Sequence, residues 1–197
     1  MDPDMSYREE DSTSLASKRT EGKLSPHDDE GNSNPQGRLT SDGVILKTRG
    51  RYLKIGTWNV RTLYQPGKLA NLIQEMENIN LDILGLAETK WTDSGKIIKD
   101  SHTMIYSGGE EHKKGVGIIM KNSVARSMIG YWAISERVIM MKLQSKPFDI
   151  NIIQIYAPTQ DYDEEDIEEF YEEVQLAIKN TKSCDITYVM GDFNAKV

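Results

Sequence analysis

Apolar positions are sparse at the start of the chain and become regularly spaced only from about residue 51. Residues 1–48 are rich in Ser, Asp, Glu, Gly, Asn and Pro and contain few aromatic or β-branched side chains. Such a segment buries too little apolar surface to offset the entropy that is lost on ordering. We therefore expect a disordered, acidic and polar tail over 1–48 and a folded domain over 51–197.

Several segments of the folded part have the apolar pattern of β-strands. Residues 53–59 alternate apolar side chains with polar or small ones and end at Asn59, which is typical of a strand. Residues 81–87 are almost wholly apolar, as in a strand that is buried on both faces. The same reasoning predicts strands over 115–121, 138–144, 150–156 and 186–190.

Other segments have the spacing of amphipathic helices. Pro66 and Gly67 interrupt the chain, and helical intervals then separate the apolar residues Leu69, Leu72, Ile73, Met76 and Ile79. A second helix is predicted over 163–181, where an acidic first turn suits the helix dipole and one face carries Ile167, Phe170, Tyr171, Val174 and Ile178. Strands outnumber helices, which predicts a layered α/β or α+β domain.

Composition narrows the class of protein. The 197 residues are enough for one domain with a hydrophobic core. A formal net charge of −7 excludes a strongly basic nucleic-acid coat but not an enzyme whose acidic groups hold a cation. The acidic start of the chain is unlike a signal peptide, and no apolar run is long enough to span a bilayer. With Cys184 as the single cysteine, we expect an intracellular protein of nucleus or cytoplasm, not secreted; no protein partner is indicated.

Polar side chains stand at the ends of the predicted strands. Five of them lie at or just beyond the C-terminal end of a strand: Asn59, Glu88, Tyr156, and the pair Asp192 and Asn194. Strand ends that meet at one edge of a sheet bring their side chains into a shared crevice. Carboxylates, amides and a phenol suit a hard cation such as Mg²⁺, which takes one or two protein carboxylates and leaves other positions to water and phosphate.

Each of these residues has an ordinary explanation when it is taken alone. Glu88 could be a solvated acid at a strand end, and Asn59 a turn or capping residue. Tyr156 could be a packing residue with a wet hydroxyl, and Gly191 followed by Asp192 is a common turn signal. Only their joint occurrence, in this order, favours a site.

The order and spacing of short motifs resemble a known superfamily. The motifs are Thr57–Val60, Ile83–Lys90, Gly115–Gly117, Ile155–Pro158 and Gly191–Asn194. Together they resemble the endonuclease/exonuclease/phosphatase superfamily, and most closely the endonuclease domain of non-LTR retrotransposons and the craniofacial development protein 2-like proteins, which look derived from such elements. The resemblance covers about residues 51–197. It implies a DNase I-like two-sheet sandwich flanked by helices, which hydrolyses phosphodiesters of nucleic acid, DNA above all, with Mg²⁺ or Mn²⁺.

The resemblance also implies roles for individual residues. By motif position Glu88 would be the main metal ligand, with Asn59 close to the metal and the phosphate. Lys90 would contact the nucleic-acid backbone, although a solvated loop charge is an equal alternative. Among the catalytic residues, Asp192 would activate a water that Asn194 orients, and Tyr156 would hydrogen-bond the scissile phosphate or the leaving oxygen.

The sequence departs from the superfamily at two places. Arg61 stands where the apurinic/apyrimidinic endonucleases carry an Asp, which favours the retroelement branch. The superfamily's later Asp and its Asp-His pair are also absent from the chain, and the available histidines are predicted in the tail or in surface loops: His27, His102 and His112. We therefore expect a domain truncated at its C-terminus, with unpaired sheet edges and weak or absent activity. Alternatives are a non-catalytic retroelement-derived remnant or binding module, and a phosphatase acting on a phospholipid or an inositol phosphate.

Overall fold

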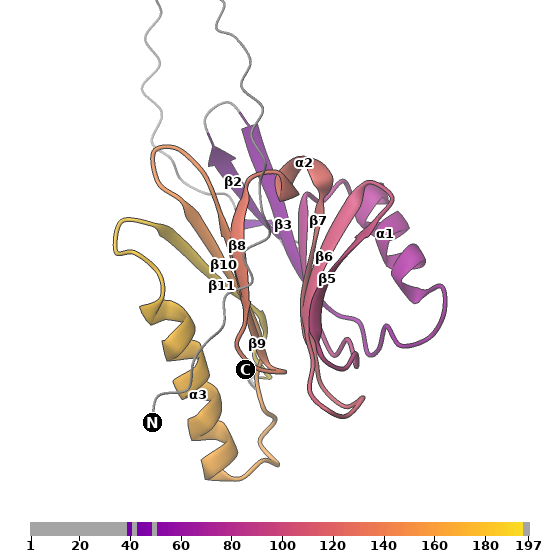
Figure 1. The fold of residues 1–197 in the computed structure, drawn as a ribbon, viewed down its shortest axis with the longest axis vertical. Coiled ribbons are helices and arrows are strands. Elements are labelled where there is room, and N and C mark those ends of the chain that lie inside the picture. The colour runs from indigo at the N-terminus through magenta and orange to yellow at the C-terminus, as the bar shows by residue number, and fades with distance from the viewer. Residues whose placement is uncertain (1–38, 41–42, 49–50, 195–197) are drawn as a thin grey trace, which may run out of the picture. The chain divides into compact units, whose positions relative to one another are not determined.

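Two β-sheets face each other, and each carries a long helix on its outer side (Figure 1). The computed structural model describes residues 39–40, 43–48 and 51–194. The larger sheet has seven strands in the order β1-β2-β3-β4-β7-β6-β5. Their bounds are β1 Leu39–Thr40, β2 Gly43–Thr48, β3 Arg51–Asn59, β4 Ile83–Ala87, β5 Ser94–Lys99, β6 His102–Ser107 and β7 Val116–Lys121.

The smaller sheet has four strands in the order β11-β10-β9-β8. Their bounds are β8 Met128–Ala133, β9 Val138–Leu143, β10 Ile150–Tyr156 and β11 Ile186–Asp192. The helices are α1 Lys68–Asn78, the short α2 Asn122–Ala125, and α3 Glu164–Lys179. The predicted two-sheet sandwich flanked by helices is therefore confirmed. Among the described helices none has both the length and the apolar character needed to cross a membrane.

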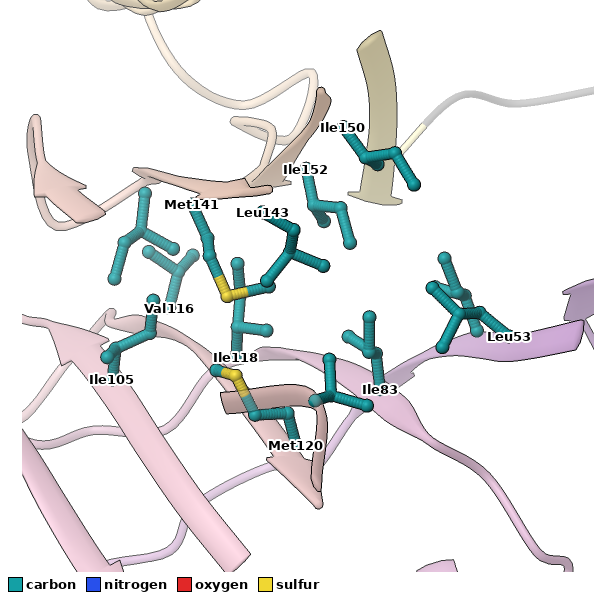
Figure 2. Close-up of a cluster of buried hydrophobic side chains, with 13 residues drawn as sticks. Leu53, Ile83, Ile105, Val116, Ile118, Met120, Met141, Leu143, Ile150 and Ile152 are labelled. Atoms are coloured by element: carbon teal, nitrogen blue, oxygen red, sulfur yellow. The ribbon is translucent and has the colours of Figure 1, made fainter. Parts of the chain in front are cut away.

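The main core fills the space between the two sheets. Figure 2 shows side chains such as Met141 and Ile152 from the smaller sheet pointing toward Ile118 and Met120 of the larger one. These residues are almost completely shielded from solvent, and each buried aliphatic side chain contributes roughly 1.5–3 kcal/mol of transfer free energy. The continuous apolar runs predicted as buried strands thus face partners on both sides of each sheet.

Each long helix covers the outer face of one sheet. Met76 of α1 packs against Leu84 and Leu86 of β4, and Phe170 of α3 packs against the outer face of β9 and β10. The expected apolar face of α3 is wrong at two positions, since Tyr171 is 60% exposed and Ile178 is 44% exposed. The contact is instead centred on Phe170, Val174 and Ala177.

Order begins earlier than the sequence pattern indicated. The predicted tail over 1–48 contains β1 and β2, so the prediction is wrong for 39–40 and 43–48; the remainder of that segment lies outside the described residues. The physical reason is local pairing, because β2, with the apolar run Val44–Leu46, is antiparallel to β3, where Leu46 lies opposite Leu53. The strands β5, β6 and β8 were also not predicted; β5 has few apolar residues and is largely exposed, and β8 is partly exposed and contains Gly130.

One parallel strand pair in each sheet determines where the strand ends meet. In the larger sheet β3 and β4 are parallel, with Asn59 opposite Ala87. In the smaller sheet β10 and β11 are parallel, with Tyr156 opposite Asp192. The residues predicted at strand ends therefore come side by side within each sheet, and contacts of β11 with β3 and β4 bring the two pairs together.

Among the described strands, β11 lies at an edge of the smaller sheet and pairs only with β10. Ile186 and Val189 of this strand are exposed. Unpaired backbone groups and apolar side chains at an edge favour association with another strand.

Candidate active site

The polar residues predicted at the strand ends meet in one hydrogen-bonded group. Asn59 Nδ2 donates to Glu88 Oε1 at 2.7 Å and to Asp192 Oδ2 at 2.8 Å. The hydroxyl of Tyr156 donates to the same Glu88 oxygen at 3.1 Å. All four residues are partly exposed to solvent. Because both carboxylates contact a single nitrogen atom, they are close enough to share one cation.

A left-handed turn at the end of β4 directs Glu88 toward this group. Glu88 has a φ of 56°, and the next residue, Thr89, turns into the core and is fully buried. Two backbone hydrogen bonds hold Thr89. Its N–H donates to Gly115 O at 3.0 Å, and its carbonyl oxygen accepts from the Leu63 N–H at 2.9 Å. Gly115 has a φ of 112°, and a Cβ there would collide with Thr89 Oγ1. The glycine therefore permits the turn that positions Glu88.

A second turn at the end of β11 positions Asp192. Gly191 has a φ of 147°, and a Cβ there would collide with the carbonyl oxygen of Ile155. The backbone N–H of Asn194 donates to Asp192 Oδ1 at 3.1 Å, and the Asn194 side chain donates through Nδ2 to Ala157 O at 2.6 Å. Asn194 therefore holds both the Asp192 carboxylate and the end of β10.

Tyr156 is a hydrogen-bond donor at neutral pH. Burial raises the pKa of Tyr156 to about 12, and the negative charge of Glu88 acts in the same direction, whereas Arg137 opposes it. The phenol is therefore protonated under ordinary conditions. A neutral hydroxyl beside a carboxylate can donate to that carboxylate or to a phosphate oxygen, but it cannot act as a base.

The donor set fits a hard divalent cation. Glu88 and Asp192 supply carboxylate oxygens, which Mg²⁺ prefers. Asn59 presents its amide nitrogen to both, while its Oδ1 accepts from the Arg61 backbone N–H at 3.0 Å. Among the described residues no group of three or more His, Cys, Asp and Glu side chains gathers as a metal site. A cation here would take one or two protein carboxylates and complete its coordination with water and substrate, which is the usual pattern for Mg²⁺.

Lys90 lies on the same loop as Glu88, and its backbone contacts the loop that carries Lys114 and His112. Its φ is also 56°, its N–H donates to Lys114 O at 2.8 Å, and its carbonyl oxygen contacts His112 Nδ1 at 2.7 Å. A carbonyl oxygen only accepts, so His112 donates here. The contact of the Lys90 ammonium with nucleic acid stays a prediction.

The described histidines do not join the carboxylate group. His112 lies in an exposed loop, as predicted, and His27 is outside the described residues. The prediction of a surface loop is wrong for His102, which is the first residue of β6 and only 1% exposed. Its strand lies between β5 and β7 in the larger sheet, so the ring is buried by neighbouring elements.

Sequence reasoning missed Arg137, which contacts Tyr156 directly. Arg137 Nη1 donates to Tyr156 O at 3.0 Å, and its guanidinium carbon lies 5.3 Å from the centroid of the Tyr156 ring. Arg137 precedes the apolar run 138–141 in the sequence. The sequence signal for Arg137 was a single cationic residue at the start of a predicted buried strand. That signal is weak, because many solvated residues occupy such positions.

The sequence of residues 56–197 matches the Endonuclease/Exonuclease/phosphatase family. The chain belongs to this family. Craniofacial development protein 2 of Bos taurus is 42% identical over 144 residues, which are 73% of this chain and 24% of that protein. Craniofacial development protein 2 of Tragulus javanicus is 39% identical over 159 residues, which are 80% of this chain and 28% of that protein. This member of the family thus spans about a quarter of the length of these relatives.

Three solved structures have a fold similar to that of this chain. The AP endonuclease of Leishmania major has a TM-score of 0.57 at 18% identity, with 80% of this chain and 63% of that chain covered. D. rerio TDP2 complexed with a single-strand DNA product has a TM-score of 0.53 at 13% identity, with 74% and 62% covered. The endonuclease domain of TRAS1, a telomere-specific non-LTR retrotransposon, has a TM-score of 0.52 at 15% identity, with 74% and 60% covered. The DNase I-like fold expected for the family member is confirmed.

Proposed function

We propose that this chain carries the amino-terminal part of a metal-dependent phosphodiesterase of the endonuclease type, which acts on DNA with Mg²⁺ or Mn²⁺. The observation that carries the proposal is the shared contact of Glu88 and Asp192 with Asn59, beside the hydroxyl of Tyr156. Two carboxylates, an amide and a neutral phenol suit the hydrolysis of a phosphate ester. Structural relatives that are named as nucleases, such as the AP endonuclease and the TRAS1 domain, support this choice.

Glu88 would be the principal ligand of the cation, with Asn59 close to it and Asp192 beside them as the base. When bound, the ion supplies Lewis-acid polarisation of the phosphate. Asp192 accepts a proton from the attacking water, because a carboxylate within reach of a water is a general base. Asn194 orients that water through its Oδ1, because its Nδ2 already donates a hydrogen bond to Ala157 O.

Tyr156 and Asn59 act as donors in this proposal. The phenol of Tyr156 stays protonated because its pKa is about 12, so it donates to a non-bridging phosphate oxygen or to the leaving oxygen. Donors aimed at developing charge stabilise a transition state more than a ground state. The Asn59 amide keeps the carboxylates in place when no cation lies between them.

The distribution of charge supports a polyanionic substrate despite the net charge of −7. Acidic residues concentrate on α3 and the loop before it: Asp161, Asp163, Glu164, Glu165, Asp166, Glu168, Glu169, Glu172 and Glu173. Over residues 51–160 the lysines and arginines outnumber the acids. The part of the domain that supplies Glu88, Lys90 and Tyr156 is therefore net basic, which favours approach of a phosphate backbone.

A plasmid-nicking assay tests the proposal. Supercoiled DNA is incubated with the chain in Mg²⁺ and in EDTA, and the rate of nicking is compared with that of Glu88→Gln and Asp192→Asn. We expect weak Mg²⁺-dependent nicking that falls by at least about 100-fold in each variant, the range for loss of one acid–base or metal-binding group. The matched control is Glu75→Gln on the exposed face of α1, which should nick at the wild-type rate.

The same assay identifies the non-catalytic alternative. Circular dichroism and thermal unfolding first establish that each protein is folded. Folded wild-type chain that does not nick DNA in Mg²⁺ or Mn²⁺ contradicts the proposal and favours a retroelement-derived remnant or binding module. Nicking that survives in both carboxylate variants would also contradict it, because the activity would then belong to another site or to a contaminant.

A further inference from the structure

Arg137 is a buried cation that interacts electrostatically with the carboxylate of Glu173 but lies too far from it to form an ion pair. Its side chain is 7% exposed, and Nη2 is buried without a hydrogen-bond partner. No ion pair among the described residues includes it. A buried charge is costly unless it is paired or otherwise held, so the groups that contact this guanidinium decide its position.

The contacts of Arg137 converge on Tyr156. Nη1 donates to Tyr156 O at 3.0 Å, and the Tyr156 N–H donates in return to Arg137 O at 2.9 Å. The guanidinium carbon lies 5.3 Å from the Tyr156 ring centroid and 4.7 Å from that of Tyr162. A guanidinium at this distance is attracted to the ring faces, so both the backbone and the ring of Tyr156 are held by one side chain.

The backbone of Arg137 is itself anchored to other elements. Its N–H donates to Ser135 Oγ at 3.1 Å, and that hydroxyl donates to Glu173 of α3 at 2.7 Å. The carbonyl of the intervening Glu136 accepts from the Gly115 N–H at 3.1 Å. Gly115 also permits the turn that directs Glu88, so the segment carrying Arg137 connects α3 to the loop beside the candidate site.

We propose that Arg137 is a positioning residue, which holds the phenol of Tyr156 against the carboxylate of Glu88. Its consequence for the reaction rests on the proposed phosphodiesterase function, whereas its structural part does not. The planar guanidinium suits this task because it can donate to a carbonyl and contact ring faces at the same time. The compact ammonium of a lysine does not combine these contacts.

Tyrosine NMR tests the structural part without any need for activity. The whole chain is labelled with ¹³C at the tyrosine ring ε-carbons and studied in EDTA, and Tyr156→Phe identifies the Tyr156 signal. In Arg137→Met this signal should shift or broaden more than that of the remote Tyr52. Tyr162→Leu, at a partly exposed ring, provides a milder change should Arg137→Met fold poorly, and a smaller effect in the same direction is expected. A Tyr156 signal that is unchanged in the folded variants overturns the proposal.

Nicking kinetics test the consequence for the reaction. Arg137→Met should lower kcat at least about 10-fold with less than about a 3-fold change in KM, and Arg137→Lys should not restore the rate. In the Tyr156→Phe background, where there is no hydroxyl to position, the same substitution should change kcat by less than about 2-fold. Full rescue by lysine, or an equal loss in both backgrounds, would show that Arg137 acts on the substrate directly and would overturn the proposal.

The two readouts separate this inference from the proposed function. If the wild-type chain does not nick DNA, the phosphodiesterase function is contradicted, and the NMR comparison alone decides whether Arg137 positions Tyr156. A wild-type chain that nicks DNA, with a Tyr156 signal insensitive to Arg137, contradicts only the positioning role.

Discussion

Glu88 and Asp192 come from different sheets, and their carboxylates accept hydrogen bonds from one amide nitrogen. Asn59 Nδ2 donates to Glu88 Oε1 at 2.7 Å and to Asp192 Oδ2 at 2.8 Å. The neutral amide of Asn59 therefore offsets the repulsion between the two negative carboxylates. A cation would stabilise the same pair of carboxylates more strongly than the amide does.

Substitution of Asn59 by aspartate should make folding depend on a divalent cation. Asn59→Asp removes the donor and adds a third carboxylate, so the free energy of unfolding in EDTA should fall by about 1–3 kcal/mol. Mg²⁺ should then raise the melting temperature of Asn59→Asp by more than that of wild type. Thermal unfolding with and without Mg²⁺ measures both effects. Asn71→Asp on the exposed face of α1 is the control, and equal stability of Asn59→Asp and wild type in EDTA would contradict the role given to the amide.

Gly191 should be more sensitive to substitution than a glycine that also has a positive φ but lies in open space. Gly191→Ala adds a Cβ that collides with Ile155 O, and its φ of 147° disfavours any side chain. Gly67 also has a positive φ, of 84°, but a Cβ there meets nothing within 4 Å. Strain at such positions costs on the order of 1–3 kcal/mol. Gly67→Ala measures the backbone effect alone.

Urea unfolding distinguishes the two glycines. Gly191→Ala should lose more stability than Gly67→Ala, because the collision adds to the backbone strain. It should also displace Asp192, the next residue, and so lower the rate of Mg²⁺-dependent nicking in protein that remains folded. Equal losses of stability in the two variants would show that the strand end accommodates the added carbon.

The strand ends could be predicted from sequence because each of them follows an apolar run that is recognisable locally. Asn59 and Glu88 each end a recognisable apolar run, and so do Tyr156 and Asp192. Chain order and strand direction were then sufficient to expect these residues at one edge. The structure confirms that they meet, although the chemical roles given to them remain to be tested.

Three features could not be predicted from the sequence, because they depend on contacts between elements that are distant along the chain. The edge strand β5 was missed because its residues are mostly exposed and follow no apolar run. Arg137 gave no local indication that it contacts Tyr156 and Tyr162, since those contacts arise only when β9 pairs with β10 and the following loop folds back. The buried state of His102 likewise comes from its neighbours in the sheet rather than from its sequence context.

The hydroxyl of Tyr156 should affect stability at high pH. Its folded pKa of about 12 lies above the ordinary value of 10.0, owing first to burial and then to Glu88. The folded state therefore favours the protonated phenol, and this stability is complete below pH 10 and is lost as the pH rises toward 12. Urea unfolding of wild type and Tyr156→Phe should show a difference in free energy that changes between pH 10 and 12. Tyr188, whose pKa burial also raises, is present in both proteins and cancels. A difference that stays constant over that range would contradict the raised pKa.

His102 should make the domain sensitive to mild acid. Burial lowers its pKa below 6.5, and Lys121 acts in the same direction, whereas Glu77 and Asp100 oppose it. The folded state thus favours the neutral ring, in which Nε2 is buried without a partner. Stability from this group is present above pH 6.5 and is lost as the pH falls through the folded pKa, because the unfolded chain then binds a proton that the folded chain excludes.

Denaturant unfolding between pH 7.5 and 5.0 tests this sensitivity. Below pH 6.5 one such histidine lowers the free energy of unfolding by at most about 1.4 kcal/mol per pH unit, and His102→Gln should remove that part of the slope whatever its effect on stability at pH 7.5. His112→Gln changes an exposed ring on the loop beside Lys90 and is the matched control for the loss of a histidine. An unchanged slope in His102→Gln would place the acid sensitivity elsewhere, and a reduced slope in His112→Gln would assign it to the rim of the site rather than to the core of the larger sheet.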